Sequence, residues 1–475
     1  MRAVCLTLPT NRECAATIAA IGAEAAYAAR RFGVRVHLLI LDSADPATYR
    51  RHAEAVAALR AVGSGVTPGT ASDAVFGTAS GTASGTASGT ASGTGEVVVH
   101  HLDEAAQRGF LRDVIERSGA AGPADGPLGE HLLDLMLPDA VSYGACTNRA
   151  FLLAGALGCA SVHRRDSDSA YQLLDGEPVF PIEHELATLG LKAADAAAAV
   201  TEVALDPVHA DKPVALVGGS FVGELSVDIG EIRELDPDAY HQVVGLWAPT
   251  GASEQERREL VADSFTGGGT DPFRHDRAVL DLPDIWRIDM CNVALDHEVY
   301  DRVPLPPATA TIGSDYFLLH LVRDATLPGV VHNRHIVNYY TPERRTGAGF
   351  TAYQLRYAKF LLSMLYLYPV YSEMEAAGGA LLDEANRIRA DVIADSARRS
   401  AATDRAENHR RLDALDHCYR RLGGKYAEFA DHLAPERARL LDEAQADIED
   451  FALLIDAWGP LMRASKATPA DRLPR

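Results

Sequence analysis

The sequence lacks a hydrophobic run long enough to cross a lipid bilayer. The longest apolar segment, 360–371, is interrupted by Ser363 and Pro369, whereas a membrane-spanning helix needs about 20 apolar residues. The chain also shows no secretory signal, because a short strand-like segment leads directly to Pro9. We therefore expect a cytoplasmic protein without an integral membrane segment.

Positive charge and paired cysteines are also scarce. The chain has 45 basic and 66 acidic side chains, a net charge of -21. This balance excludes the basic footprint of a nucleic-acid-binding protein and disfavours docking on anionic membranes. The six cysteines include no Cys-x-x-Cys pair, so we expect neither a disulfide framework nor a zinc site of that kind.

What the sequence does contain is a strong α/β pattern. Strands are predicted at 2–8, 34–41 and 96–101, with helices at 14–31 and 47–62. Nearly continuous apolar strands that alternate with helices are typical of a parallel sheet covered on both faces. We therefore predict an α/β domain over 1–346, with a doubly wound, mostly parallel sheet.

Two other segments depart from this pattern. In the segment 63–95 the motif Gly-Thr-Ala-Ser occurs four times in succession from Gly77 to Ser92, and a tract without apolar periodicity predicts a flexible insertion. Residues 347–475 carry apolar side chains at helical spacing. They predict an all-helical extension with an antiparallel hairpin joined at Ala434-Pro435. Its apolar seam would pack against the main domain or against a twin chain in a homodimer.

Four polar motifs follow predicted strands or lie near their ends, and in a doubly wound sheet ligands bind beyond the carboxyl ends of the strands. The motifs are 9–12 (Pro-Thr-Asn-Arg), 42–45 (Asp-Ser-Ala-Asp), 166–168 (Asp-Ser-Asp) and 313–315 (Gly-Ser-Asp). Asp166 and Asp168 offer the oxygen ligands that Mg²⁺ or Mn²⁺ prefers. Alternatively, they could cap a helix and solvate a loop, while Arg164 and Arg165 could pair with nearby acids.

The order of these motifs resembles the nucleotide-sugar glycosyltransferases of the GT-A fold, especially the large inverting family 2-like group, over about the first two-thirds of the chain. The resemblance implies that Asp166 and Asp168 hold Mn²⁺ or Mg²⁺, which bridges the diphosphate of the donor. It also implies a set of residues around the donor nucleotide: Pro9, Thr10, Asn11, Arg12, Asp42, Asn148, Arg149 and Asp166. Asn148 and Arg149 match the polar start of the helix that precedes the family's Asp-x-Asp.

Later motifs extend the resemblance. The segments 291–294, 304–307 and 313–315 look like the family's Asn-containing strand, Pro-rich connection and Gly-Glu-Asp motif, with Ser314 in place of the glutamate. Asp315 matches the catalytic base, although it could instead cap the helix that carries Phe317.

The fold further suggests His332 or His335 as a later metal ligand, although each could be structural. Three arginines are candidates to neutralise the diphosphate: Arg334, Arg344 and Arg345.

The motifs together predict a metal-dependent glycosyltransferase. It would move a sugar from a nucleotide-diphosphate donor to a hydroxyl or another nucleophile of a small-molecule or glycan acceptor, with inversion. A nucleotidyltransferase on the same sheet is one alternative, but its Gly-rich basic loop is missing from 9–13. The other alternative is a non-catalytic scaffold whose helices mediate assembly.

Overall fold

The computed structural model describes residues 1–63, 95–122, 125–224, 229–269, 271–339 and 342–469. The predicted 63–95 insertion lies outside the described residues, apart from its two end positions. Among the described residues, none of the helices is long and apolar enough to cross a membrane.

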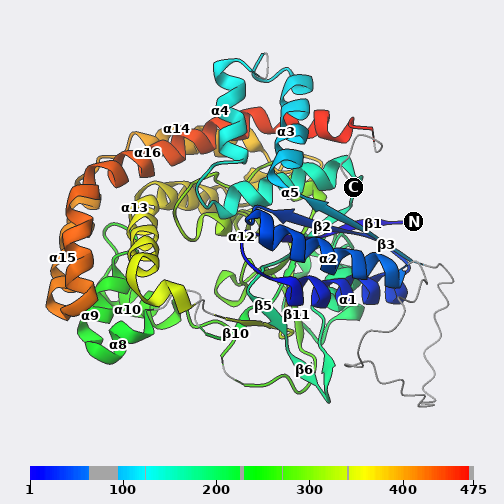
Figure 1. Ribbon diagram of the computed structural model, residues 1–475, viewed down its shortest axis with the longest axis horizontal. Coiled ribbons are helices and arrows are strands. Elements are labelled where there is room, and N and C mark those ends of the chain that lie inside the picture. Colours follow the sequence, from blue (N-terminus) through cyan, green and yellow to red (C-terminus); the bar gives the residue numbers. More distant parts are fainter. Residues whose placement is uncertain (64–94, 123–124, 225–228, 270, 340–341, 470–475) are drawn as a thin grey trace.

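A mixed, mostly parallel sheet of nine strands organises the described part of the chain (Figure 1). In spatial order the strands are β3 (Glu96–Leu102), β2 (Arg35–Asp42), β1 (Ala3–Thr10), β4 (Ser161–Arg165), β12 (Asn292–Asp296), β9 (Leu216–Gly218), β13 (Gly329–His332), β11 (Ala278–Asp281) and β8 (Glu202–Val203). Strands β1 to β4 are mutually parallel, whereas β12 runs antiparallel to both β4 and β9. The predicted α/β class and mostly parallel sheet are confirmed.

Helices cover both faces of the sheet because successive side chains of a strand point to opposite sides. Val4, Leu6 and Leu8 pack in one core with α1 (Ala15–Phe32) and α2 (Pro46–Gly63). Cys5 lies in the other core, with α3 (Glu104–Ser118) and α5 (Tyr143–Ala156). The buried strands thus carry apolar side chains on both faces, which explains their nearly continuous apolar sequence.

The second half of the chain adds elements around the sheet. A small sheet contains β10 (Phe221–Gly223), β14 (Ile336–Asn338) and β5 (Ser169–Tyr171), and β6 (Leu173–Leu174) pairs with β7 (Glu177–Pro178). The helices before residue 346 include α4 (Pro127–Met136), α6 (Ile182–Thr188), α7 (Ala193–Ala196), α8 (Gly230–Leu235), α9 (Pro237–Gly245), α10 (Glu254–Asp263), α11 (His297–Tyr300) and α12 (Phe317–Asp324).

The C-terminal region is helical, but the hairpin turns at a different place from the predicted one. Its helices are α13 (Gly347–Ala377), α14 (Ala390–Ala401), α15 (Ala406–Leu422) and α16 (Gly424–Lys466). The turn lies at Gly423 and Gly424, whose φ angles are 72° and 50°, a region open to glycine at little cost. Pro435 instead lies inside α16. The prediction of a turn at Ala434-Pro435 was wrong, because the proline did not end the helix and the glycine pair did.

The hairpin is antiparallel and packs against its own chain. Ion pairs join Arg420 to Asp431 and Arg405 to Asp442, so α15 and α16 run in opposite directions. Figure 1 shows α16 arching from α15 back towards α3 and α5. The indole N–H of Trp458 on α16 donates to the carbonyl of Tyr300 in the sheet domain (2.6 Å). The apolar seam is therefore buried within one chain, and the homodimer stays a prediction.

Candidate functional site

A cavity of about 810 Å³ opens at the carboxyl ends of β1, β2 and β4. One wall comes from the sheet edge and the other from α10, α12, α13 and the loops between them. The structure brings many of the predicted site residues to this cavity: Pro9, Thr10, Asn11, Arg12, Arg149, Asp166, Asp168, Asp315 and Arg344. They meet because parallel strands end at the same edge of the sheet.

Carboxylates and arginines alternate on the sheet wall of the cavity. Asp168 lies 3.3 Å from Arg12 and 3.6 Å from Arg344. Arg164, on β4, pairs with Asp315 at 2.5 Å and with Asp166 at 3.3 Å. These distances join atoms of the guanidinium and carboxylate groups. Each of these carboxylates therefore has an arginine beside it. A cationic ligand would have to replace an arginine, and an anionic ligand would have to replace a carboxylate.

The pKa of Asp166 is high for an aspartate. Burial raises its pKa, and although Arg164 opposes this, the nearby carboxylates of Asp168, Asp315 and Asp289 raise it further, to about 6. Repulsion among close carboxylates is relieved when a divalent cation binds between them. Asp166 and Asp168 flank Ser167 at the end of β4 and are partly open to the cavity, with side-chain exposures of 27% and 18%.

Asp315 does not cap a helix. It lies in the 3₁₀ turn Ser314–Tyr316, and neither this turn nor α12 has a side-chain cap. Its carboxylate instead accepts a hydrogen bond from Arg164. The helix-cap alternative for Asp315 is therefore wrong.

Asn148 is structural rather than a cavity residue. It lies in the middle of α5 and not at its start. Its amide donates to the carbonyl of Leu305 and accepts from the N–H of Leu305, both at 2.8 Å. Because both ends of the buried amide are used in this way, Asn148 holds the Pro-rich connection instead of a nucleotide, and the predicted role is corrected.

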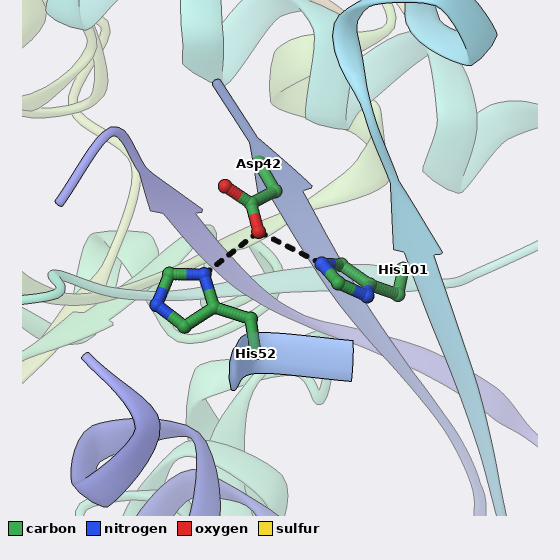
Figure 2. Close-up of side chains that lie close together, drawn as sticks. All are labelled: Asp42, His52 and His101. Carbon is green, nitrogen blue, oxygen red and sulfur yellow. Dashed lines mark hydrogen bonds and ion pairs between the residues drawn. The ribbon is translucent and has the colours of Figure 1, made fainter. Parts of the chain in front are cut away.

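Asp42 is likewise turned away from the cavity, into a buried group with two histidines (Figure 2). Its carboxylate accepts from His52 Nδ1 (2.7 Å), His101 Nε2 (2.8 Å) and the N–H of Ala44 (2.9 Å). Burial would raise its pKa, but the hydrogen bonds from His101 and His52 outweigh burial and lower it. The predicted contact of Asp42 with the nucleoside is therefore not supported, whereas its neighbour Ser43 does line the cavity.

Among the residues that the structure describes, Asp42, His52 and His101 are the only group of three with the spacing of metal ligands. The hydrogen bonds argue against an ion there. His52 Nε2 accepts the backbone N–H of Cys14 at 3.0 Å, so the ring proton must sit on Nδ1, the atom that faces Asp42. A protonated nitrogen has no lone pair for a metal, and hydrogen bonding accounts for the whole cluster.

His332 and His335 do not join Asp166 and Asp168. His332 is buried at the end of β13, stacked on His184, and His335 Nδ1 accepts the N–H of Ser220. Strand β13 lies three strands from β4, a separation of about 14 Å at about 4.8 Å per strand. Neither histidine is therefore placed as the later metal ligand that was predicted.

Two of the three predicted phosphate-binding arginines also point elsewhere. Arg334 pairs with Asp276 at 2.7 Å, and Arg345 pairs with Glu224 at 2.7 Å. Neither lines the cavity, whereas Arg344 does. Arg12, Arg164 and Arg344 are thus the arginines beside the carboxylates.

Comparison with known proteins identifies the family but not an activity. A model described as a family of unknown function, DUF6271, matches residues 2–73 and 78–474. The chain belongs to the DUF6271 family. The match covers the sheet and the C-terminal helices alike, and no curated protein matches the chain.

This DUF6271 chain also has a cavity residue that the sequence reasoning missed. Asp289 lines the cavity and accepts a hydrogen bond from the Tyr316 hydroxyl at 2.7 Å. It precedes β12, and the antiparallel register places Asn292 opposite Arg165. The start of β12 therefore lies beside the end of β4, so Asp289 comes close to Asp166. To find Asp289 from the sequence, one would have had to predict that β12 lies next to β4 and runs antiparallel to it.

Proposed function

We propose that the protein is a metal-dependent, inverting glycosyltransferase that uses a nucleotide-diphosphate sugar. The observation that carries this proposal is the joint presence in one cavity of residues 9–12 at the end of β1, Asp166, Asp168 and Asp315, with Arg12 and Arg344 paired to Asp168. A GT-A-like arrangement of the sheet is part of the proposal. Its support is the parallel run of β3, β2, β1 and β4, of which β2, β1 and β4 end at this cavity.

The chemistry of the side chains fits a divalent cation and a diphosphate together. Asp166 and Asp168 would hold Mn²⁺ or Mg²⁺ through carboxylate oxygens. When bound, the ion would stabilise the negative charge on the departing diphosphate. Binding at Asp168 would replace the ion pairs that this carboxylate forms with Arg12 and Arg344, whose guanidinium groups match phosphate oxygens well. The ion pairs of the structure would thus be exchanged for ligand contacts with little loss of favourable charge interaction.

Asp315 is the proposed base. The acceptor oxygen attacks the anomeric carbon of the sugar, and a new C–O bond forms on the face opposite the diphosphate. The old bond from carbon to the diphosphate oxygen breaks, and its electron pair leaves with the nucleotide. Asp315 takes the acceptor's hydroxyl proton as the bond forms. Arg164 holds the Asp315 carboxylate through the 2.5 Å ion pair.

Isothermal titration calorimetry tests the donor and the metal together. We expect one of UDP, GDP, ADP, CDP or dTDP to bind in the presence of Mn²⁺ and to bind far more weakly without it. Asp166→Ala should weaken Mn²⁺-dependent binding by at least about 100-fold, since even outer-shell partners of a metal are worth 10- to 100-fold.

Asp263→Ala is the matched control for Asp166→Ala. Asp263 lines the same cavity and is exposed, but it lies on α10, away from the sheet edge. Its removal should leave nucleotide affinity within about twofold. If none of the five nucleotides binds, the proposed function is overturned. If Asp166→Ala binds a nucleotide as tightly as the wild type and does not need Mn²⁺ to do so, the metal site is overturned.

The raised pKa of Asp166, about 6, predicts a pH dependence of metal affinity. Above pH 6 the group is a carboxylate and binds the cation, whereas below pH 6 it is protonated and must lose its proton first. We expect Mn²⁺ affinity to fall about tenfold per pH unit below pH 6 and to be nearly constant from pH 7 to 8. Titration of Mn²⁺ at pH 5.0, 6.0 and 7.5 measures this, and a flat profile across that range would contradict the assignment.

A further inference from the structure

The cavity has a second wall with a different chemistry from the sheet wall. It is built outside the sheet, from the segments that follow α9 and α10, from the turn Ile285–Arg287 and from α13. Its side chains are mostly large and aromatic: Trp247, Phe265, Trp286, Phe360, Tyr368 and Tyr371. Two of the three tryptophans of the chain therefore lie in this one cavity.

The rings of this wall are arranged around Trp247. Its ring centroid lies 5.7 Å from that of Phe265, 5.7 Å from that of Trp286 and 5.3 Å from that of Phe360. The Trp286 ring is nearly perpendicular to it, at 89°, and Trp286 is 38% exposed. The wall thus offers ring faces and ring edges at right angles, the two surfaces against which another aromatic ring packs best.

Trp247 also carries a hydrogen-bond donor that is not used within the part of the chain that the structure describes. Its Nε1 is buried and has no partner there. Buried indole N–H groups normally find an acceptor, because an unpaired buried donor is unfavourable. Because the atom is buried, a ligand oxygen beside the aromatic wall reaches this donor only when the side chains around it move.

The cavity side of α12 is also uncharged. His320 lines the cavity and stacks on Tyr371, with ring centroids 3.8 Å apart. Burial lowers the pKa of His320 to about 4, so the imidazole is neutral at physiological pH. Asp315 lies five residues before His320 in the chain, in the turn that precedes α12, and both residues line the cavity.

We propose that the aromatic wall binds the acceptor, and that the acceptor is a flat aromatic alcohol; this rests on the proposed transferase function. The ring system would pack against Trp247 and Trp286, and one of its oxygens would accept the Trp247 N–H. Its hydroxyl would point to Asp315. In the transfer the acceptor O–H bond breaks, its proton passes to Asp315, and the oxygen bonds to the sugar carbon as the nucleoside diphosphate leaves.

Other acceptor classes fit this wall less well. A sugar presents many hydroxyl groups, whereas most of the surface that lines the cavity is apolar. A single alkyl chain has no ring face to match the perpendicular aromatic pairs and no oxygen along its length for the Trp247 donor. An aromatic alcohol uses both features.

Calorimetry without nucleotide or metal tests the acceptor site by itself. The probes are 7-hydroxy-4-methylcoumarin as the aromatic alcohol, glucose as the sugar and 1-octanol as the alkyl alcohol. We expect the coumarin to bind more tightly than either of the others. Trp286→Ala should weaken coumarin binding about tenfold, as expected for a lost ring contact and its buried area. Because Trp286 is exposed, this variant should keep the fold, which circular dichroism checks.

Two further variants sharpen the result. Trp247→Phe keeps an aromatic ring but removes the N–H, and we expect a loss of about threefold to tenfold in coumarin affinity. Leu235→Ala, at an exposed position on α8 outside the cavity, should leave it unchanged. Tighter binding of glucose or 1-octanol than of the coumarin would overturn the inference, as would unchanged coumarin affinity in both tryptophan variants.

The failure of this inference is distinguishable from failure of the proposed function. Nucleotide binding with Mn²⁺ but no coumarin binding would overturn the aromatic acceptor and leave the transferase proposal standing. Coumarin binding without any nucleotide binding would support an aromatic ligand site and overturn its role in sugar transfer.

Discussion

Asp315→Asn should lower the rate of donor-sugar hydrolysis by about 10²- to 10⁴-fold, the usual contribution of a general base. The asparagine oxygen can still accept the hydrogen bond that Arg164 donates to Asp315, so the local geometry should be kept. What the amide cannot do is take a proton. The rate would be measured as release of nucleoside diphosphate from a nucleotide sugar in the absence of acceptor, where water takes the acceptor's place.

Two comparisons separate this chemical role from a structural one. Affinity for the nucleotide with Mn²⁺ should stay within about threefold of wild type in Asp315→Asn, because the loss is in proton transfer and not in donor binding. Asp263 lines the same cavity but lies on α10. The Asp263→Asn variant should hydrolyse the donor at the wild-type rate. Full hydrolysis by Asp315→Asn with intact donor binding would remove Asp315 from the mechanism.

Arg165→Leu should destabilise the fold by about 3–5 kcal/mol, the usual effect of removing one partner from a buried ion pair. The Arg165 side chain is 1% exposed and donates to both Glu24 (2.8 Å) and Glu185 (3.1 Å). Glu185 also accepts from His163, and Glu24 accepts from Tyr171. Leucine would leave two buried carboxylates without their arginine, in a protein whose total stability is expected to be about 5–15 kcal/mol.

Urea denaturation followed by circular dichroism measures this effect, and Arg35→Leu is its matched control. Arg35 forms an equally direct ion pair with Glu96 (2.9 Å), but the two side chains are 48% and 51% exposed. An exposed pair is worth less than about 1 kcal/mol because water screens it. Equal losses of stability in the two arginine variants would show that burial does not set the strength of the Arg165 cluster.

Arg164 and Arg165 are neighbours in the chain but form ion pairs on opposite faces of the sheet, because successive side chains of a strand point to opposite sides. Arg164 and Arg165 follow each other at the end of β4, so their side chains point to opposite faces of the sheet. Arg164 meets Asp166 and Asp315 at the cavity, whereas Arg165 meets Glu24 on α1. The sequence indicated that both could pair with acids, but only the fold says which acids and on which face.

Local sequence was sufficient for the sheet and for the cavity edge. The apolar segments that became β1 and β2 each alternate with a helix, and this pattern depends only on neighbouring residues. Because parallel strands end at one edge, the polar residues after β1 and β4 could be placed together without any knowledge of packing. Residues 9–12, at the end of β1 and just after it, line the cavity with Asp166 and Asp168 for that reason.

Tertiary structure decided the features that depend on strand order, register and competition for hydrogen bonds. Strand β12 pairs antiparallel with β4 and brings Asp289 to the site, while β13 ends three strands away and keeps His332 out. Asp42 is the last residue of β2, one position beyond the predicted strand 34–41, and its carboxylate is hydrogen-bonded by two histidines, one on α2 and one on β3. These outcomes join residues far apart in the chain, and no pattern of neighbouring residues records which distant groups will meet.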